Sequence, residues 1–122
     1  VARDLIRTGV ARKDGVAISG RSNGGVLVGA AMTQHPDLYS AVISGSPLHD
    51  MKRYSHLLAG ASWMAEYGDP DVPAEWAYIS KYSPYHTLPP GTKYPRVLFT
   101  TSTASKGRSP RMSPSGAWPR CA

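Results

Sequence analysis

Residues 20–25, Gly-Arg-Ser-Asn-Gly-Gly, constrain the fold more than any other segment of the chain, because they lie between two apolar runs. The first run, residues 16–18, predicts a buried strand, and the second, residues 26–32, predicts a helix. A Gly-x-Ser-x-Gly sequence in this strand–turn–helix setting is typical of a tight turn that presents a serine nucleophile. Ser22 is therefore the candidate nucleophile, held on a strained backbone at the tip of the turn.

The residue types around Ser22 meet the physical demands of such a turn. Gly20 and Gly24 lack a Cβ, and we expect both to let the strand and the helix approach closely. Asn23 begins the predicted helix, so its backbone N–H has no partner within the helix and can point toward an oxyanion formed by attack of Ser22. The alternative is a loop that only turns a corner or holds phosphate. The segment lacks the Lys-Ser/Thr ending of a phosphate loop and the glycine spacing of a dinucleotide fingerprint.

The charge of the chain does not indicate a nucleic-acid partner. The net charge is +6, but residues 1–103 contribute only +2, and residues 104–122 supply the rest without any acidic residue. Such a basic run is usually a solvated segment, so we expect no nucleic-acid binding. No apolar run approaches the length of a membrane span, and no membrane contact is expected.

The cysteine and histidine content limits the chemistry further. A single cysteine, Cys121, excludes an internal disulfide and favours a reducing compartment, so we expect a cytoplasmic protein. No Cys/His cluster has the spacing of metal ligands, so we expect no metal. No organic cofactor is expected either.

Helical and strand patterns alternate along the chain and predict an α/β fold with a parallel sheet. In such a sheet the site lies at the carboxyl ends of the strands, where we expect Ser22, Ser46 and Ser102 to emerge. Besides the elements around Ser22, helices are predicted for residues 1–8, 51–64 and 74–82, and buried strands for residues 39–44 and 95–101, with the helix after Ser22 ending at His35.

Four further segments accompany the Gly-Arg-Ser-Asn-Gly-Gly turn in order: residues 27–30, 60–70, 81–86 and 94–103. Together the five segments resemble the catalytic domain of the prolyl oligopeptidase family of serine peptidases, over about residues 1–103. The resemblance implies a partial α/β-hydrolase fold, in which helices flank a parallel sheet. It also implies a serine-type oligopeptidase that cleaves short peptides after proline through an acyl-enzyme.

The resemblance assigns roles at three positions, and helical spacing adds a fourth. Ser22 matches the nucleophile, and Asn23 matches the residue whose backbone N–H forms part of the oxyanion hole. Trp63 matches the indole that stacks on the substrate proline, and Tyr67, one helical turn later, would line the same pocket. Without the resemblance, Trp63 would be interpreted as a packing aromatic. Short proline-containing peptides are the substrates that this assignment implies.

The family pattern ends at Thr103. The family places Asp-Asp-Arg-Val after a strand of this kind and a histidine further on, but here no acidic residue follows Glu75 and no histidine follows His86. Residues 104–122 are rich in Ser, Pro and Arg, and we expect a disordered tail that arises from a shifted reading frame or from genuine divergence. Because loss of triad members costs orders of magnitude in rate, we expect this chain to be nearly inactive.

The histidines within the chain are poor replacements for the missing base. We expect His35 to point away from Ser22, and His56 and His86 to have ordinary surface or loop roles. His49, with Asp50 beside it, follows a predicted strand on the same side of the sheet as the site.

Asp50 itself is better interpreted as a turn or helix-capping residue.

Two other functional classes remain possible for the whole chain. One is an esterase of the same fold, which would have no use for Trp63 as a proline platform, and the other is a non-catalytic remnant.

Overall fold

The computed structural model describes residues 1–57 and 59–101. Ser102 and the expected tail, residues 104–122, lie outside the described residues. None of the helices described is both long enough and apolar enough to cross a membrane. The helices and strands are α1 (Ala2–Arg7), β1 (Ala17–Arg21), α2 (Asn23–Gln34), β2 (Ala41–Gly45), α3 (Met64–Tyr67), α4 (Pro73–Ile79) and β3 (Arg96–Thr100), with 3-10 helices η1 (Pro36–Leu38), η2 (Tyr54–His56) and η3 (Gly60–Trp63) between them.

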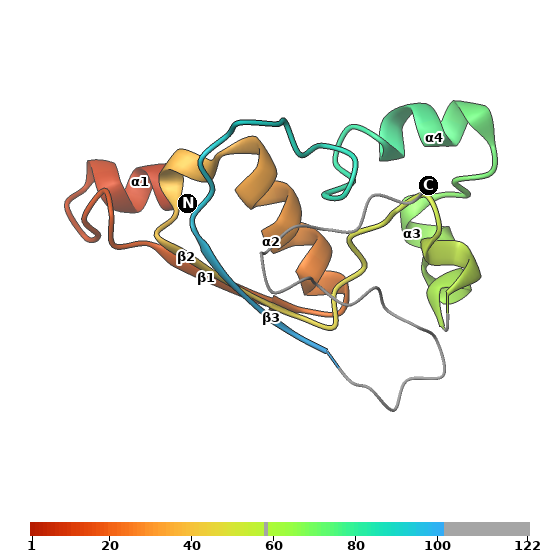
Figure 1. Ribbon diagram of the computed structural model, residues 1–122, viewed down its shortest axis with the longest axis horizontal. Helices are drawn as coiled ribbons and strands as arrows, with labels where there is room; N and C mark the ends of the chain where they lie inside the picture. The colour runs from red at the N-terminus through yellow and green to blue at the C-terminus, as the bar shows by residue number, and fades with distance from the viewer. Residues whose placement is uncertain (58, 102–122) are drawn as a thin grey trace.

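The three strands form one parallel sheet in the order β1-β2-β3. Their register places Ile18 beside Val42 and Val42 beside Val97, so that β-branched side chains occupy the middle of the sheet. Helix α2 connects β1 to β2 and crosses one face of the sheet, whereas α3 and α4 lie beyond the carboxyl ends of the strands (Figure 1). The predicted α/β fold with a parallel sheet is confirmed.

A hydrophobic core fills the space between α2 and the sheet. Val28 and Met32 of α2 are buried against Val42 of β2, and Ile18 and Val97 pack around them from the outer strands. Because successive side chains of a strand point to opposite faces of the sheet, only one face contributes to this core. On the opposite face, Ile43 and Leu98 are 45% and 57% exposed, and no described helix covers them (Figure 1).

A second buried cluster joins the start of α2 to the segments beyond the strands. Val26 of α2 packs with Met51, Tyr54 and Ile79, all of which are buried. Six partly buried side chains surround these four residues: Leu48, Trp63, Met64, Tyr67, Trp76 and Tyr82. This second cluster therefore positions α3 and α4 against the end of α2 that follows Ser22.

The prediction of one helix over residues 51–64 is wrong. Residues 51–53 form a turn, η2 and η3 follow, and of the residues described in this range only Met64, the first residue of α3, is α-helical. The chain doubles back at Gly60, which lies so close to the carbonyl of Tyr54 that a Cβ at this glycine would overlap it. Burial of the Tyr54 ring holds this compact path, and an interior glycine also disfavours a continuous helix.

Close packing of β1 against α2 depends on Gly20. A Cβ at Gly20 would overlap the carbonyl of Gly24 and would lie 2.9 Å from Cγ1 of Val28. A Cβ at Gly24, by contrast, would meet no atom within 4 Å. The expectation of a close approach is therefore confirmed for Gly20 and wrong for Gly24, because it is the Gly24 carbonyl, and not a missing side chain, that lies at the contact.

We predict opposite effects of alanine at these two glycines. Gly20→Ala forces α2 away from β1 and should lower the free energy of unfolding by roughly 1–3 kcal/mol, as overpacking does. Gly24→Ala adds a methyl group in open space within a helix and should be neutral or stabilising by up to about 1 kcal/mol. Urea unfolding of the two variants measures the difference, and equal effects would contradict this account of the contact.

Candidate active site

Ser22 is the single residue between β1 and α2, as the sequence predicted. Its φ of 54° and ψ of −117° lie in a region that L-residues rarely occupy, and its side chain is exposed. The Ser22 N–H donates to the carbonyl of Gly45 at 2.8 Å, and the Ser22 carbonyl accepts from the N–H of Gly25 at 2.9 Å. The strained backbone is thus held from β2 on one side and from α2 on the other, which presents the hydroxyl to solvent.

Asn23 is the first residue of α2, so its backbone N–H has no partner within the helix. Its half-buried side chain is engaged, because the hydroxyl of Tyr67 donates a hydrogen bond to Asn23 Oδ1. The structure therefore brings two of the four predicted site residues into direct contact. The sequence assigned Tyr67 to the same pocket as Trp63 but gave no sign of this bond to Asn23.

Trp63 is the last residue of η3 and directly precedes α3, which ends at Tyr67. Both aromatic side chains are half-buried and pack against the second buried cluster. Burial, with a smaller contribution from Glu66, raises the pKa of Tyr67 above its ordinary value, which is itself well above neutral pH, so the phenol is a hydrogen-bond donor. The fold thus places the predicted proline-binding residues on one short segment beside the start of α2.

An open hollow of about 330 Å³ lies at the carboxyl ends of the strands. Ser46 lines it with Arg21, Thr100 and Thr101, and the Ser46 N–H donates to the carbonyl of Thr100 at 2.6 Å. Ser46 follows β2 just as Ser22 follows β1, so both serines emerge at the predicted edge of the sheet. Arg21 lies inside the Gly-x-Ser-x-Gly segment, yet the sequence pattern predicted no role for it.

The model of the prolyl oligopeptidase family matches residues 1–106 of the chain. The chain belongs to this family. It is 48% identical over 103 residues to an uncharacterised peptidase of Sinorhizobium fredii, and the match covers 84% of this chain. It is also 44% identical over 99 residues, or 80% of this chain, to a prolyl endopeptidase of Elizabethkingia miricola. In each case the match covers only 14% of the relative's own length.

The fold agrees with this membership in the prolyl oligopeptidase family. A solved post-proline cleaving enzyme from Rickettsia typhi superposes with a TM-score of 0.79 at 32% identity. The superposition covers 85% of this chain and 20% of that one. The partial α/β-hydrolase fold implied by the sequence motifs is confirmed, and the family supports a serine-type hydrolase.

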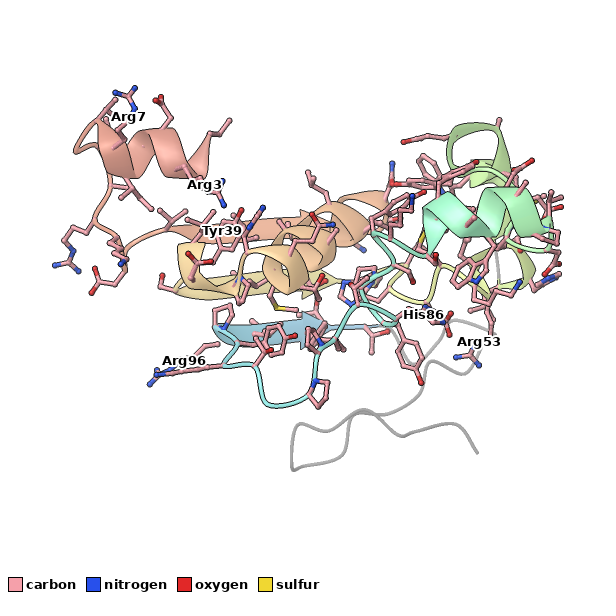
Figure 2. The ribbon with its side chains drawn as sticks, turned by 90° about the horizontal axis from the view of Figure 1, so that it is seen from above. Arg3, Arg7, Tyr39, Arg53, His86 and Arg96 are labelled. Atoms are coloured by element: carbon pink, nitrogen blue, oxygen red, sulfur yellow. The ribbon has the colours of Figure 1, made fainter. Side chains whose placement is uncertain are left out.

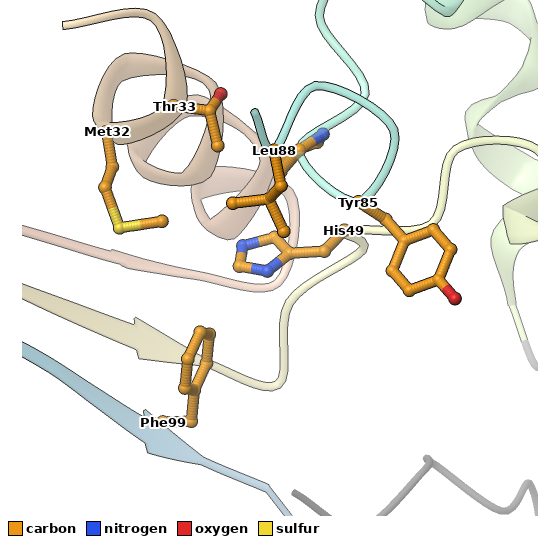
Figure 3. A pocket seen from close by; sticks show the side chains of 7 residues that line it. Met32, Thr33, His49, Tyr85, Leu88 and Phe99 are labelled. Atoms are coloured by element: carbon orange, nitrogen blue, oxygen red, sulfur yellow. The ribbon is translucent and has the colours of Figure 1, made fainter. Parts of the chain in front are cut away.

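His49 is a buried packing residue beneath the start of α2. Its Nε2 lies 3.0 Å from the carbonyl oxygen of Gly25 and 3.2 Å from Oγ of Ser44, and its ring meets Phe99 edge-on with centroids 5.6 Å apart. Figure 3 shows the imidazole between α2 and Phe99 of β3, beside a small cavity of about 20 Å³. Burial lowers the pKa of His49, although the bond to Gly25 opposes the shift, so the imidazole is neutral. This arrangement ties α2 to β2 and directs Nε2 away from solvent.

The chain has four histidines, and all of them lie within the described residues. The other three have partners away from Ser22, which agrees with the expectations that His35 points away from it and that His56 and His86 have surface or loop roles; Figure 2 shows His86 near α4. These partners are Arg3 for His35 at 3.3 Å, Asp71 for His56 at 2.7 Å, and Ser83 for His86 at 2.8 Å. Within residues 1–57 and 59–101, no histidine is hydrogen-bonded to Ser22.

Asp50 has the turn-capping role that the sequence predicted. Its Oδ1 accepts from the backbone N–H of Lys52 at 3.2 Å, and its Oδ2 lies 2.6 Å from Nε of Arg53. These contacts hold the turn that leads into η2. They leave Asp50 paired with a neighbouring cation of the same turn rather than with the imidazole of His49.

We predict that His49 makes the free energy of unfolding depend on pH. Its pKa is lowered in the folded chain, whereas the unfolded chain has the ordinary value near 6.5. Below about pH 6.5 the unfolded state therefore binds a proton that the folded state does not, and the stability falls as the pH is lowered. Urea unfolding at pH 7.5 and 5.5 should show this loss, at most about 1.4 kcal/mol per pH unit.

The matched variants are His49→Gln and His56→Gln. The first removes the buried imidazole and should flatten the pH dependence, whatever its effect on the stability at pH 7.5. The second leaves His49 in place and should keep the slope of the parent chain. A steep slope that survives in His49→Gln would assign the effect to other groups.

Proposed function

We propose that Ser22 is the nucleophile of a serine peptidase that cleaves peptides after proline. The observation that carries this proposal is the backbone of Ser22, which has a φ of 54° between a strand and a helix and an exposed side chain. A rarely populated conformation that is held by hydrogen bonds on both sides is costly, and such strain concentrates at functional sites. Membership in the prolyl oligopeptidase family supports the same reaction class.

The proposed reaction is acyl transfer. The hydroxyl of Ser22 attacks the carbonyl carbon of the scissile peptide bond while a general base accepts its proton. The N–H of Asn23 stabilises the oxyanion of the tetrahedral intermediate, with the start of α2 adding favourable electrostatics. Protonation of the leaving amine then gives the acyl-enzyme, which water hydrolyses to free the carboxyl product and restore Ser22.

The proposed substrate pocket is formed by Trp63 and Tyr67. A flat indole offers a pyrrolidine ring a large apolar contact that needs no hydrogen bond. The bond from Tyr67 to Asn23 supports this pocket, because it places the aromatic segment beside the residue that follows the nucleophile. The names of the prolyl endopeptidase from Elizabethkingia miricola and of the post-proline cleaving enzyme from Rickettsia typhi support the same preference.

We further propose that the 122-residue chain is nearly inactive when it is isolated. All four of its histidines have other partners, and His49, which contacts the start of α2, is buried and neutral. Without a base, attack by Ser22 loses several orders of magnitude in rate. The reaction is therefore best tested in a graft enzyme, the Elizabethkingia miricola prolyl endopeptidase in which residues 1–101 of this chain replace the matching segment.

We predict that Ser22→Ala abolishes hydrolysis of a proline-containing peptide by the graft enzyme. The expected loss in kcat is about 10³-fold or more, because no other group can form the acyl-enzyme. Ser46→Ala is the matched control, since Ser46 is exposed and has a φ of 40° at the end of the neighbouring strand. Labelling with a fluorophosphonate should be lost in the Ser22 variant and retained in the Ser46 variant. Activity that survives in Ser22→Ala would end the proposal.

We also predict that Trp63→Leu separates a proline-selective peptidase from an esterase. Loss of the indole should raise KM for a proline-containing peptide about tenfold or more and leave hydrolysis of a small ester nearly unchanged. Trp76→Leu is the control, because Trp76 belongs to the same buried cluster but lies on α4, where it contacts Lys52 and His86. Equal effects of Trp63→Leu on peptide and ester would favour the esterase, and no effect on either would favour a packing role.

A further inference from the structure

The hydroxyl of Tyr67 is already committed to a partner next to the nucleophile. It donates to Oδ1 of Asn23, a residue 44 positions earlier in the sequence. Both side chains are half-buried, so competition from solvent water is reduced at this bond. Burial raises the pKa of Tyr67 further above its ordinary value, so ionisation of the phenol does not compete with this donation at neutral pH. The phenol oxygen is therefore held by the protein, whereas a residue whose only role is to contact substrate would leave its hydroxyl open to the ligand.

The backbone at Tyr67 and at the next residue is anchored independently. The carbonyl of Tyr67 accepts a hydrogen bond from the hydroxyl of Tyr78 at 3.0 Å, and the carbonyl of Gly68 accepts one from the hydroxyl of Tyr54. Gly68 has a φ of 94°, and a Cβ there would overlap the hydroxyl of Tyr78. Two tyrosines therefore hold the end of α3 in one place.

The ring of Tyr67 is held as firmly as its backbone. It meets the ring of Tyr54 edge-on with centroids 6.0 Å apart, and it packs at an angle of 40° against Tyr82 with centroids 6.2 Å apart. Tyr54 is fully buried and belongs to the second buried cluster. A ring that is fixed on two sides can place its hydroxyl with little loss of side-chain entropy when the bond forms.

The bond from the fixed Tyr67 hydroxyl affects what the side chain of Asn23 can do. An asparagine side chain near the start of a helix can bond to nearby backbone groups and compete with the regular structure. Because the hydroxyl of Tyr67 donates to Oδ1, the carboxamide oxygen of Asn23 is less available to accept a hydrogen bond from the backbone. The backbone N–H of Asn23 is then left to face the oxyanion that forms on attack by Ser22.

We propose that Tyr67 is a positioning residue, which acts through Asn23 to hold the oxyanion-binding end of α2 and to fix the distance between this end and the segment that carries Trp63. This inference rests on the proposed function of Ser22 and goes beyond it. The ring of Tyr67 can still form a wall of the pocket, while its hydroxyl works within the protein. Loss of the hydroxyl then affects kcat more than substrate binding.

The kinetic test compares Tyr67→Phe with Tyr82→Phe in the graft enzyme. Both changes remove one phenol oxygen from the same aromatic cluster, but only the first removes the bond to Asn23. We expect Tyr67→Phe to lower kcat for a proline-containing peptide roughly 3- to 10-fold with KM within twofold, as loss of one hydrogen bond allows. Tyr82→Phe should keep the parent kcat. A raised KM with unchanged kcat, or equal effects of the two variants, would overturn the proposal.

A double-mutant cycle identifies the partner of the hydroxyl. Asn23→Ala removes the carboxamide and keeps the backbone N–H, so it should lower kcat about as much as Tyr67→Phe. If the two residues act as one unit, Tyr67→Phe adds little in the Asn23→Ala background, whereas additive losses would contradict the coupling. Ser22→Ala is run in parallel, because activity that survives there removes the proposed function itself and not only the role of Tyr67.

A measurement on the 122-residue chain keeps the proposal testable if the Tyr67→Phe graft does not fold. In nuclear magnetic resonance spectra of ¹⁵N-labelled chain, Tyr67→Phe should shift both the side-chain amide and the backbone N–H signals of Asn23. It should also speed their exchange with solvent severalfold more than Tyr82→Phe does. Unchanged Asn23 signals in Tyr67→Phe would overturn the proposal.

Discussion

The contact between Gly20 and the first turn of α2 is the constraint on which the rest of the structure depends. Because Gly20 has no side chain, the carbonyl of Gly24 can approach β1 within a distance that any Cβ would forbid. Only then can one residue, Ser22, reverse the direction of the chain between strand and helix. The cost is a backbone conformation that L-residues avoid. It is held there by the Ser22 N–H, which donates to Gly45, and by the Ser22 carbonyl, which accepts from Gly25.

The two buried clusters hold different parts of α2, the helix that follows this turn. The first, beneath α2, fixes the direction of the helix through Val28, Met32 and Val42, and His49 adds a polar tie between α2 and β2. In the second, the segments that lie beyond the strands pack against Val26, which is only four residues after Ser22. Packing at both ends of α2 therefore limits the movement of the residues that follow Ser22, the proposed nucleophile, and preorganisation of this kind is what oxyanion stabilisation requires.

Local patterns predicted the elements that one segment of sequence can specify. The apolar run after Asn23 predicted α2 to within one residue, and β-branched runs predicted β2 and β3 to within two residues at each end. The same reasoning failed for residues 51–64, where Met51 and Tyr54 are buried by contacts with Val26 and Ile79 rather than along one helical face. The role of Gly24 was also misjudged, because a missing side chain says nothing about which atom of a glycine lies at a contact.

What the sequence by itself determined is the chemistry: a serine between two glycines at a strand–helix boundary, and the family whose motifs accompany it. Trp63 entered the site only through that resemblance, since an aromatic side chain in isolation more often indicates packing, and Tyr67 entered through its helical spacing from Trp63. The tertiary structure decided which groups meet. It placed the hydroxyl of Tyr67 on Asn23, 44 residues away, and turned His49 into the interior. The physical reason is that such contacts depend on how α2, the sheet and α3 pack in three dimensions, and no local periodicity records that packing.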